Sequence, residues 1–378
     1  MKEAKKILTR LLEAANIHVN GSNPWDIQVH DERFYRQVLS HGTLALGESY
    51  MAKWWDCAQL DELFTKVLIA HLDTFIKADL KLKLEIFWAR VSNLQRPSKA
   101  YEVGEQHYDI GNDLFEVMLD KRLTYTCAFW QHAHTLDEAQ AYKLDLSCRK
   151  LHLQPGMHVL DIGCGWGSFA KFAAENYGVK VTGITISKEQ AAFAQDACKG
   201  LPVDIQLMDY RLLTGQYDAI ASLGMFEHVG YKNYRQYMQV AHQCLKDDGL
   251  FLLHTIGGNH PAMFTDAWLN KYIFPNAMIP TMPLIDEAME GLFIMEHWQN
   301  FGTDYDKTLM AWYGNVVTHW PALSAKYSET FFRMWSYYLL SCAGSFRARN
   351  SQLWQLVLSK NGIRGGYAVQ PQKHVQVV

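Results

Sequence analysis

The chain has 378 residues, of which 49% are hydrophobic and 20% are charged, a balance that is typical of globular proteins and excludes a disordered or fibrous chain. The formal net charge is -3, so no strong overall field attracts the chain to nucleic acid, and no nucleic-acid partner is expected. At roughly 150 residues per domain, the length predicts about two to three domains.

The seven cysteines are scattered and contain no C-x-x-C pair, so neither a metal clip nor a disulfide framework is indicated. Free thiols fit a reducing cytosol. The charged N-terminus lacks the apolar core of a signal peptide, and no run of about 18 apolar residues predicts a membrane-spanning helix. We therefore expect a cytoplasmic protein without a bound metal, which reaches any lipid from the aqueous side.

Residues 1–96 are predicted to form a small helical domain. Apolar residues recur there three and four positions apart, as at Ile7, Leu11 and Leu12. The stretch Pro97-Ser98-Lys99 suits a linker, and residues 97–378 are then expected to form the catalytic domain.

From residue 157 onwards, short β-branched runs alternate with helical stretches, which predicts an α/β domain with a parallel sheet. The expected strands are 158–162, 179–185, 203–208, 217–223 and 250–255, with 293–298 and 353–358 completing the sheet. Residues 272–285 carry three prolines and are predicted not to form a regular helix.

The strongest local signal is a glycine-rich turn after the first of these strands. Gly163, Gly165 and Gly167 alternate with Cys164 and Trp166 directly after an apolar run that contains Asp161. Glycine lets the backbone approach a ligand closely, and open α/β sheets bind ligands at the carboxyl ends of their strands. The spacing is neither G-x-G-x-x-G nor that of a phosphate loop, which argues against a nicotinamide or ATP site.

This turn resembles that of the class I methyltransferases, which bind S-adenosylmethionine there. The next strand lacks the acidic residue that many of these enzymes place on the ribose. Read together with segments 124–130, 224–230, 253–257 and 342–349, the sequence resembles the cyclopropane-fatty-acyl-phospholipid synthases over nearly its whole length. The resemblance implies a seven-stranded, Rossmann-like methyltransferase sheet and a smaller helical N-terminal domain.

The resemblance also implies S-adenosylmethionine as the co-substrate. Thr185 and Gln190 would take the place of the missing acid. Asp209 is expected at the adenine edge, or as the cap of the next helix, and these two roles are compatible. The full set of expected contacts is Tyr125, Thr126, Asp161, Gly163, Cys164, Gly165, Trp166, Gly167, Thr185, Ser187, Gln190, Asp209 and Tyr210.

A second set of residues is expected to bind bicarbonate. Glu227 and His254 follow neighbouring predicted strands, so they can meet above the same crevice. By resemblance, they would hold the ion together with Cys127, the backbone of Ile256 and Tyr305. The sequence leaves the protonation of Glu227 and His254 open.

Cys342 is a further catalytic candidate by resemblance. Methyl transfer from a sulfonium to an alkene needs no enzyme nucleophile, so packing is the alternative role for this thiol.

The implied reaction places a methylene carbon on a cis double bond of a phospholipid acyl chain. It proceeds through a carbocation, and bicarbonate is expected to act as the general base because it is a weak nucleophile. Residues 272–285 would line the acyl slot or form a core loop. The expected partners are unsaturated phospholipid at the inner face of the membrane and a second copy of the chain. The alternative is a methyltransferase of the same fold that acts on a soluble amine or makes another lipid product.

Overall fold

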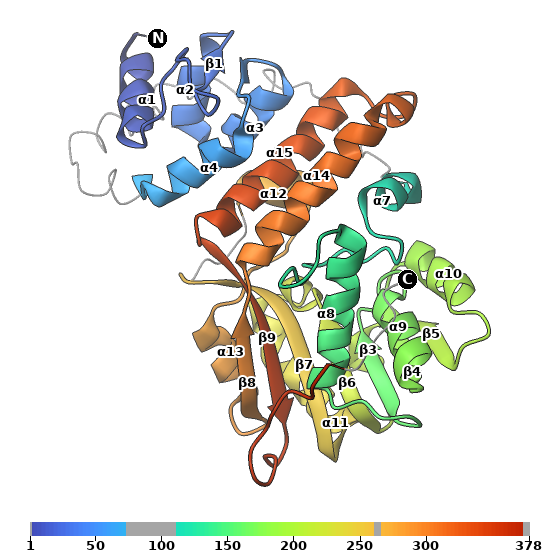
Figure 1. Cartoon of the computed structure of the whole chain (residues 1–378). Coiled ribbons are helices and arrows are strands. Elements are labelled where there is room, and N and C mark those ends of the chain that lie inside the picture. Colours follow the sequence, from blue (N-terminus) through green and yellow to red (C-terminus); the bar gives the residue numbers. More distant parts are fainter. Residues whose placement is uncertain (1, 73–110, 261–265, 373–378) are drawn as a thin grey trace. The chain divides into compact units, whose positions relative to one another are not determined.

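The computed structural model describes residues 2–72, 111–260 and 266–372 (Figure 1). The chain divides into two compact units, each assembled from separate segments. A helical unit takes residues 1–114, 264–275 and 309–350, and a sheet unit takes residues 115–263, 276–308 and 351–378. None of the helices within the described ranges is both long and apolar enough to cross a membrane.

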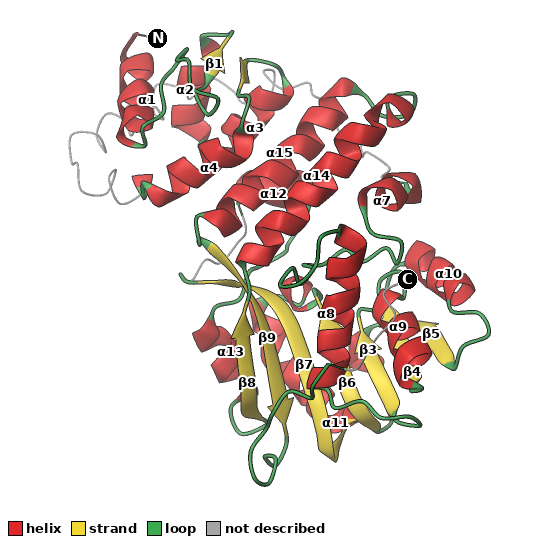
Figure 2. Ribbon diagram, viewed as in Figure 1, coloured by secondary structure: helices red, strands yellow, loops and turns green. Residues whose placement is uncertain are grey.

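The sheet unit is built on seven strands in the order β5-β4-β3-β6-β7-β9-β8 (Figure 2). Their bounds are β3 His158–Ile162, β4 Lys180–Thr185, β5 Val203–Leu207, β6 Tyr217–Leu223, β7 Leu245–Gly258, β8 Ile294–Asn300 and β9 Ser351–Ser359. β3 to β7 run parallel, whereas β9 is antiparallel to both β7 and β8. The predicted α/β fold and all seven predicted strands are confirmed.

The chain order in the sheet reverses between β3 and β6. From β3 the chain moves outward to β4 and β5, and then returns to place β6 on the other side of β3. Such a switch point opens a crevice at the carboxyl ends of the two central strands. The fold therefore creates a ligand site beside the glycine-rich turn that follows β3.

Helices cover both faces of the sheet, because alternate side chains of each strand are buried on opposite sides. One face packs on α8 (Leu136–Lys150), α9 (Ser168–Tyr177) and α10 (Lys188–Ala197). The other face packs on α11 (Tyr234–Cys244) and α13 (Met282–Met289). A capping box of Thr135 and Glu138 fixes the start of α8.

The helical unit contains α1 (Lys2–Ala14), α2 (Arg33–His41), α3 (Thr43–Met51), α4 (Leu60–Ile69), α12 (Ala267–Tyr272) and α15 (Glu329–Arg347). Two helices have residues in both units: α7 (Asn112–Met118) and α14 (Thr303–Leu323). A two-stranded ribbon, β1 (Gln28–Val29) and β2 (Trp55–Asp56), was not predicted.

Packing explains why late segments join the N-terminal helices. A side chain at Gly344 in α15 would come 2.6 Å from the carbonyl oxygen of Asp61, so only glycine allows this close approach to α4. Arg347 forms a 2.6 Å ion pair with the Asp61 carboxylate. The predicted boundary after residue 96, with its Pro97-Ser98-Lys99 linker, lies outside the described residues and stays a prediction. The helical unit combines three separate segments of the chain, so no single boundary in the sequence delimits it.

The prediction that residues 272–285 avoid regular helix is wrong at both ends, because Tyr272 is the last residue of α12 and α13 takes the C-terminal part. Residues 273–281 are irregular, but α13 begins at Met282. Pro283 lies in the first turn of that helix, where its missing N–H has no helical partner to lose.

Candidate functional site

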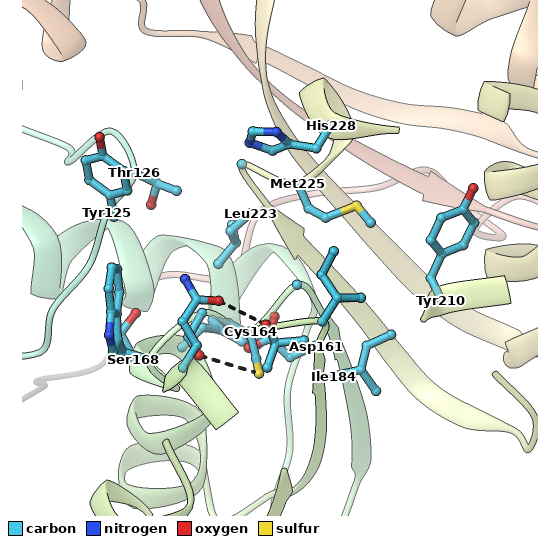
Figure 3. A pocket seen from close by; sticks show the side chains of 18 of the residues that line it. Tyr125, Thr126, Asp161, Cys164, Ser168, Ile184, Tyr210, Leu223, Met225 and His228 are labelled. Atoms are coloured by element: carbon cyan, nitrogen blue, oxygen red, sulfur yellow. Dashed lines mark hydrogen bonds between the residues drawn. The ribbon is translucent and has the colours of Figure 1, made fainter. Parts of the chain in front are cut away.

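A cavity of about 510 Å³ opens at the carboxyl ends of the parallel strands (Figure 3). Tyr125 and Thr126 lie on one side of it and Tyr210 on the other. Eleven of the expected cofactor contacts line this cavity: Tyr125, Thr126, Asp161, Gly163, Cys164, Gly165, Trp166, Thr185, Gln190, Asp209 and Tyr210. The remaining two, Gly167 and Ser187, begin the helices α9 and α10 next to the cavity.

The glycine-rich turn keeps its backbone open to the cavity. Gly163, Gly165 and Gly167 have φ angles of 84°, 55° and 85°, a left-handed region that favours glycine. A side chain at Gly163 would collide with Met225, whereas one at Gly165 would meet nothing within 4 Å. The backbone at Gly165 is therefore directly accessible to a ligand.

Beneath this turn, Asp161 and Lys143 are completely buried or nearly so. Burial raises the pKa of Asp161 to about 7, and the positive charge of Lys143 opposes that rise. Burial also lowers the pKa of Lys143 to about 8, although the nearby Asp120, Cys127 and Asp161 act to raise it. Oδ2 of Asp161 has no hydrogen-bond partner in the described part of the chain, so it can accept a hydrogen bond from a cationic ligand.

Lys143 was missed in the sequence analysis. Its Nζ donates a 2.7 Å hydrogen bond to Oγ1 of Thr126, and the carbonyl of Thr126 accepts a 2.8 Å hydrogen bond from Gln140. Two residues of α8 thus fix the loop that carries Tyr125 and Thr126. The available signal was the position of Lys143 and Lys150, whose spacing of seven residues places both on one face of α8.

The polar end of the cavity is also preorganised. Thr185 Oγ1 donates to Gln190 Oε1 over 2.9 Å, so the pair expected to replace the missing acid lies together. Asp209 accepts from the backbone N–H of Arg211, which is the capping role, and also lines the cavity. Arg211, which the sequence analysis did not single out, forms a 2.6 Å ion pair that lowers the pKa of Asp209.

The residues expected to hold bicarbonate are brought together next to this cavity. Oε1 of Glu227 accepts a 2.6 Å hydrogen bond from the N–H of Ile256, so the amide expected to bind the ion donates to Glu227 instead. Ile256 and Tyr305 pack against an apolar cluster formed by Cys127, Phe301 and Leu353. The ring of His254 meets that of Phe301 at a centroid distance of 5.8 Å.

Glu227 and His254 each present a buried polar atom, Oε2 and Nε2 respectively, without a hydrogen-bond partner in the described ranges. Burial raises the pKa of Glu227 to about 7. Burial lowers the pKa of His254 well below its ordinary value, and the nearby charges of Lys143 and Lys150 lower it further. His254 is therefore a neutral imidazole, whereas Glu227 changes protonation state near neutral pH.

Cys342 lies in α15 of the helical unit, not among the residues of the sheet unit. Burial raises the pKa of its thiol to about 12, and the charge of Asp266 acts in the same direction. Its role in catalysis stays a prediction.

Comparisons with known proteins agree with this architecture. The family model for mycolic acid cyclopropane synthetase matches residues 95–356. The chain is 52% identical over 362 residues, 95% of each chain, to a cyclopropane-fatty-acyl-phospholipid synthase of Escherichia coli K12. It also resembles a solved cyclopropane synthase of Mycobacterium tuberculosis, with a TM-score of 0.63 and 34% identity over 67% of this chain and 96% of that one. A solved mycolic acid cyclopropane synthase, complexed with SAH and CTAB, matches equally well, with a TM-score of 0.63 and 34% identity.

Proposed function

Because the chain belongs to the mycolic acid cyclopropane synthetase family, we propose that it forms cyclopropane rings on unsaturated acyl chains of membrane phospholipids. The observation that carries this proposal is the 52% identity over 95% of the chain to a phospholipid-modifying relative. The methylene carbon comes from S-adenosylmethionine, and the lipid loses a proton as the ring closes.

S-adenosylmethionine fits the cavity at the glycine-rich turn. The exposed backbone at Gly165 gives close access, and the unpartnered Oδ2 of Asp161 matches a cationic ligand. Thr185 and Gln190 supply hydroxyl and amide groups where a ribose needs hydrogen bonds. When bound, this co-substrate supplies an electrophilic methyl group.

A small oxyanion suits the cluster around Glu227. Nε2 of His254 and Oε2 of Glu227 are buried polar atoms that lack hydrogen-bond partners in the described chain. Such atoms favour an additional ligand. Two buried lysines, Lys143 and Lys150, add positive potential at His254, which favours an anion. Bicarbonate, when bound, supplies a weakly nucleophilic base.

The residues around this cluster also exclude water. Cys127, Phe301 and Leu353 are buried, and Phe129 and Tyr305 pack against them. Aromatic rings stabilise positive charge by roughly 0.5–2 kcal/mol each when they are well placed. Such surroundings suit a cationic lipid intermediate that water would otherwise capture.

The acyl chain is assigned to the irregular segment before α13. The backbone N–H of Met278 donates a 2.8 Å hydrogen bond to the carbonyl of Glu227, so this segment lies directly beside the proposed base site. Its methionine, Met278, has a side chain type that adapts to flexible ligands. We further propose that the protein works at the inner face of the membrane and as a homodimer.

The test is mass spectrometry of unsaturated phospholipid vesicles incubated with the protein, S-adenosylmethionine and bicarbonate. A methylene that bridges the former double bond is the expected product, and rigorous removal of bicarbonate should abolish it. Glu227→Gln should lose the product while retaining cofactor binding. A methyl branch would show a different fate of the cation, and methylation of a soluble amine without any lipid product would overturn the proposal.

A further inference from the structure

Gln355 connects His254 to a buried lysine. β7 and β9 pair so that His254 lies directly opposite Gln355, and paired residues project from the same face of a sheet. Nε2 of Gln355 lies 3.1 Å from Nδ1 of His254, and its Oε1 accepts a 2.8 Å hydrogen bond from Nζ of Lys150. All three residues are buried.

The lysine determines which way the amide of Gln355 points. Burial lowers the pKa of Lys150 to about 7, and in its protonated form the amine only donates hydrogen bonds, so the carbonyl oxygen of Gln355 then faces Lys150 and its NH₂ faces His254. Ser147 agrees with this orientation. Its hydroxyl donates to the carbonyl of Lys143 over 2.8 Å, so its oxygen accepts from Nε2 of Gln355 over 3.3 Å.

The amide in turn determines the tautomer of His254. A neutral imidazole carries one proton, and a nitrogen that accepts a hydrogen bond cannot hold it. Since Nδ1 accepts from Gln355, the proton is on Nε2. That Nε2–H is the buried group for which the described chain offers no partner.

We propose that Gln355, oriented by Lys150, is a positioning residue that holds His254 as a hydrogen-bond donor toward the bound oxyanion. This inference rests on the proposed function for its ligand, but the tautomer itself follows from the hydrogen bonds alone. In the opposite tautomer Nε2 would present a lone pair to an anion and repel it. The hydrogen bonds from Lys150 to Gln355 and from Gln355 to His254 therefore leave Nε2–H of His254 as a hydrogen-bond donor at the site.

A hydrogen bond from the C-terminal segment helps to hold Lys150 in place. The hydroxyl of Tyr367 donates a 2.9 Å hydrogen bond to the carbonyl of Lys150, so the C-terminal segment covers this end of α8. Other charges near these residues are Lys143, which acts on His254, and Arg149, which lowers the pKa of Lys150 together with burial. No carboxylate acts on His254 to draw its proton to Nδ1 among the groups that shift its pKa.

The decisive variant is Gln355→Glu, which keeps the shape but can only accept. Its carboxylate can pair with Lys150 and pull the histidine proton to Nδ1. Loss of one preorganised donor to an oxyanion costs on the order of 100-fold in kcat, and we expect a loss of that size. The bicarbonate concentration for half-maximal rate should rise, while the KM for S-adenosylmethionine should stay unchanged.

Nitrogen-15 NMR of histidine-labelled protein reads the tautomer directly and does not depend on turnover. The signals missing from His254→Gln identify His254. We expect a protonated Nε2 in the wild type, a protonated Nδ1 in Gln355→Glu, and a mixture in Lys150→Met, in which the amide can rotate. The matched control is Gln195→Glu, which removes an amide donor to the carbonyl of Ile205 elsewhere in the sheet unit.

A proton on Nδ1 in the wild type would overturn the inference. So would a Gln355→Glu protein with the shifted proton and wild-type kcat. If Gln355→Glu does not fold, the wild type and Lys150→Met still decide the tautomer. A wild type that makes no cyclopropane product would instead refute the proposed function, whatever the NMR shows.

Discussion

The ammonium group of Lys143 lies 2.7 Å from Oγ1 of Thr126, and Lys143 is completely buried. A buried charge thus holds one wall of the cavity in place and acts on Asp161 at its floor. Burying an ammonium is costly unless it interacts with nearby polar and acidic groups, so its position indicates a role at the site rather than in the core.

Replacing Lys143 should weaken cofactor binding in a pH-dependent way. Lys143→Met removes the charge that keeps the pKa of Asp161 from rising above about 7, so Asp161 becomes more protonated at neutral pH. A shift of one pKa unit corresponds to about a tenfold change, and we expect S-adenosylmethionine to bind about tenfold more weakly at pH 7 and to recover toward pH 9. Titration calorimetry at both pH values measures this. Lys171→Met, at a partly exposed lysine of α9, is the control, and equal affinities for Lys143→Met and wild type would contradict the expectation.

Glu227 should cost the protein stability at neutral pH. Burial raises its pKa from 4.5 to about 7, so between these values the folded state binds more protons than the unfolded state. The free energy of unfolding therefore falls as pH rises through this window. Glu227→Gln has no proton to lose, so between pH 5 and pH 8 its free energy of unfolding should rise relative to that of the wild type by about 2–3 kcal/mol.

Urea unfolding at pH 5 and pH 8 measures this difference. The matched control is Glu287→Gln, at an exposed position of α13, which should show no such gain at pH 8. The same stability difference between Glu227→Gln and wild type at both pH values would refute the argument. Activity should fall in the same variant, because the function needs the ionisable group that burial destabilises.

Two glycine-to-alanine substitutions in the glycine-rich turn should destabilise the protein to different extents. Gly165→Ala meets only open space and should cost about 1 kcal/mol for its left-handed φ. Gly163→Ala adds a collision with Met225, whose Cγ would lie 2.7 Å away, and overpacking costs about 1–3 kcal/mol more. Urea unfolding measures both variants. Equal destabilisation would show that Met225 yields without cost.

Cys342→Ala should retain the turnover of the wild type. The pKa of the Cys342 thiol is raised to about 12, so almost no thiolate exists at neutral pH, and the thiolate is the nucleophilic form. Vesicle assays by mass spectrometry measure the turnover. Cys57→Ala, at another thiol of the helical unit with a pKa of about 12, is the control. Loss of activity in a folded Cys342→Ala protein, with Cys57→Ala active, would establish a catalytic role.

Strand positions followed from the sequence because strands in a parallel sheet are short, apolar and β-branched. Six of the seven predicted strands begin or end within two residues of those in the structure, whereas β7 begins at Leu245, five residues before the predicted start. The composition of the helical unit was predicted less well from the sequence. Contacts such as that of Gly344 with Asp61 join residues far apart in the chain, and no local pattern encodes them.

The candidate site divides in the same way. The glycine spacing and the residues around Glu227 and His254 were recognisable as motifs, because each motif is contiguous. The sequence did not reveal the roles of Lys143, Lys150 and Gln355. A buried polar side chain can be identified only from its hydrogen-bond or charge partner, and these partners are distant in the sequence. Gln355 meets His254 only through the antiparallel pairing of β9 with β7.

The sequence by itself determined the secondary structure of the sheet unit, the glycine turn and the types of functional group available. Only the tertiary structure decided which of these groups are charged and which way they donate. The physical reason is that the pKa of Asp161, Glu227 and His254 depends on burial and on neighbouring charges. Burial and neighbours are set by residues distant in the chain, and they exist only once the strands have assembled.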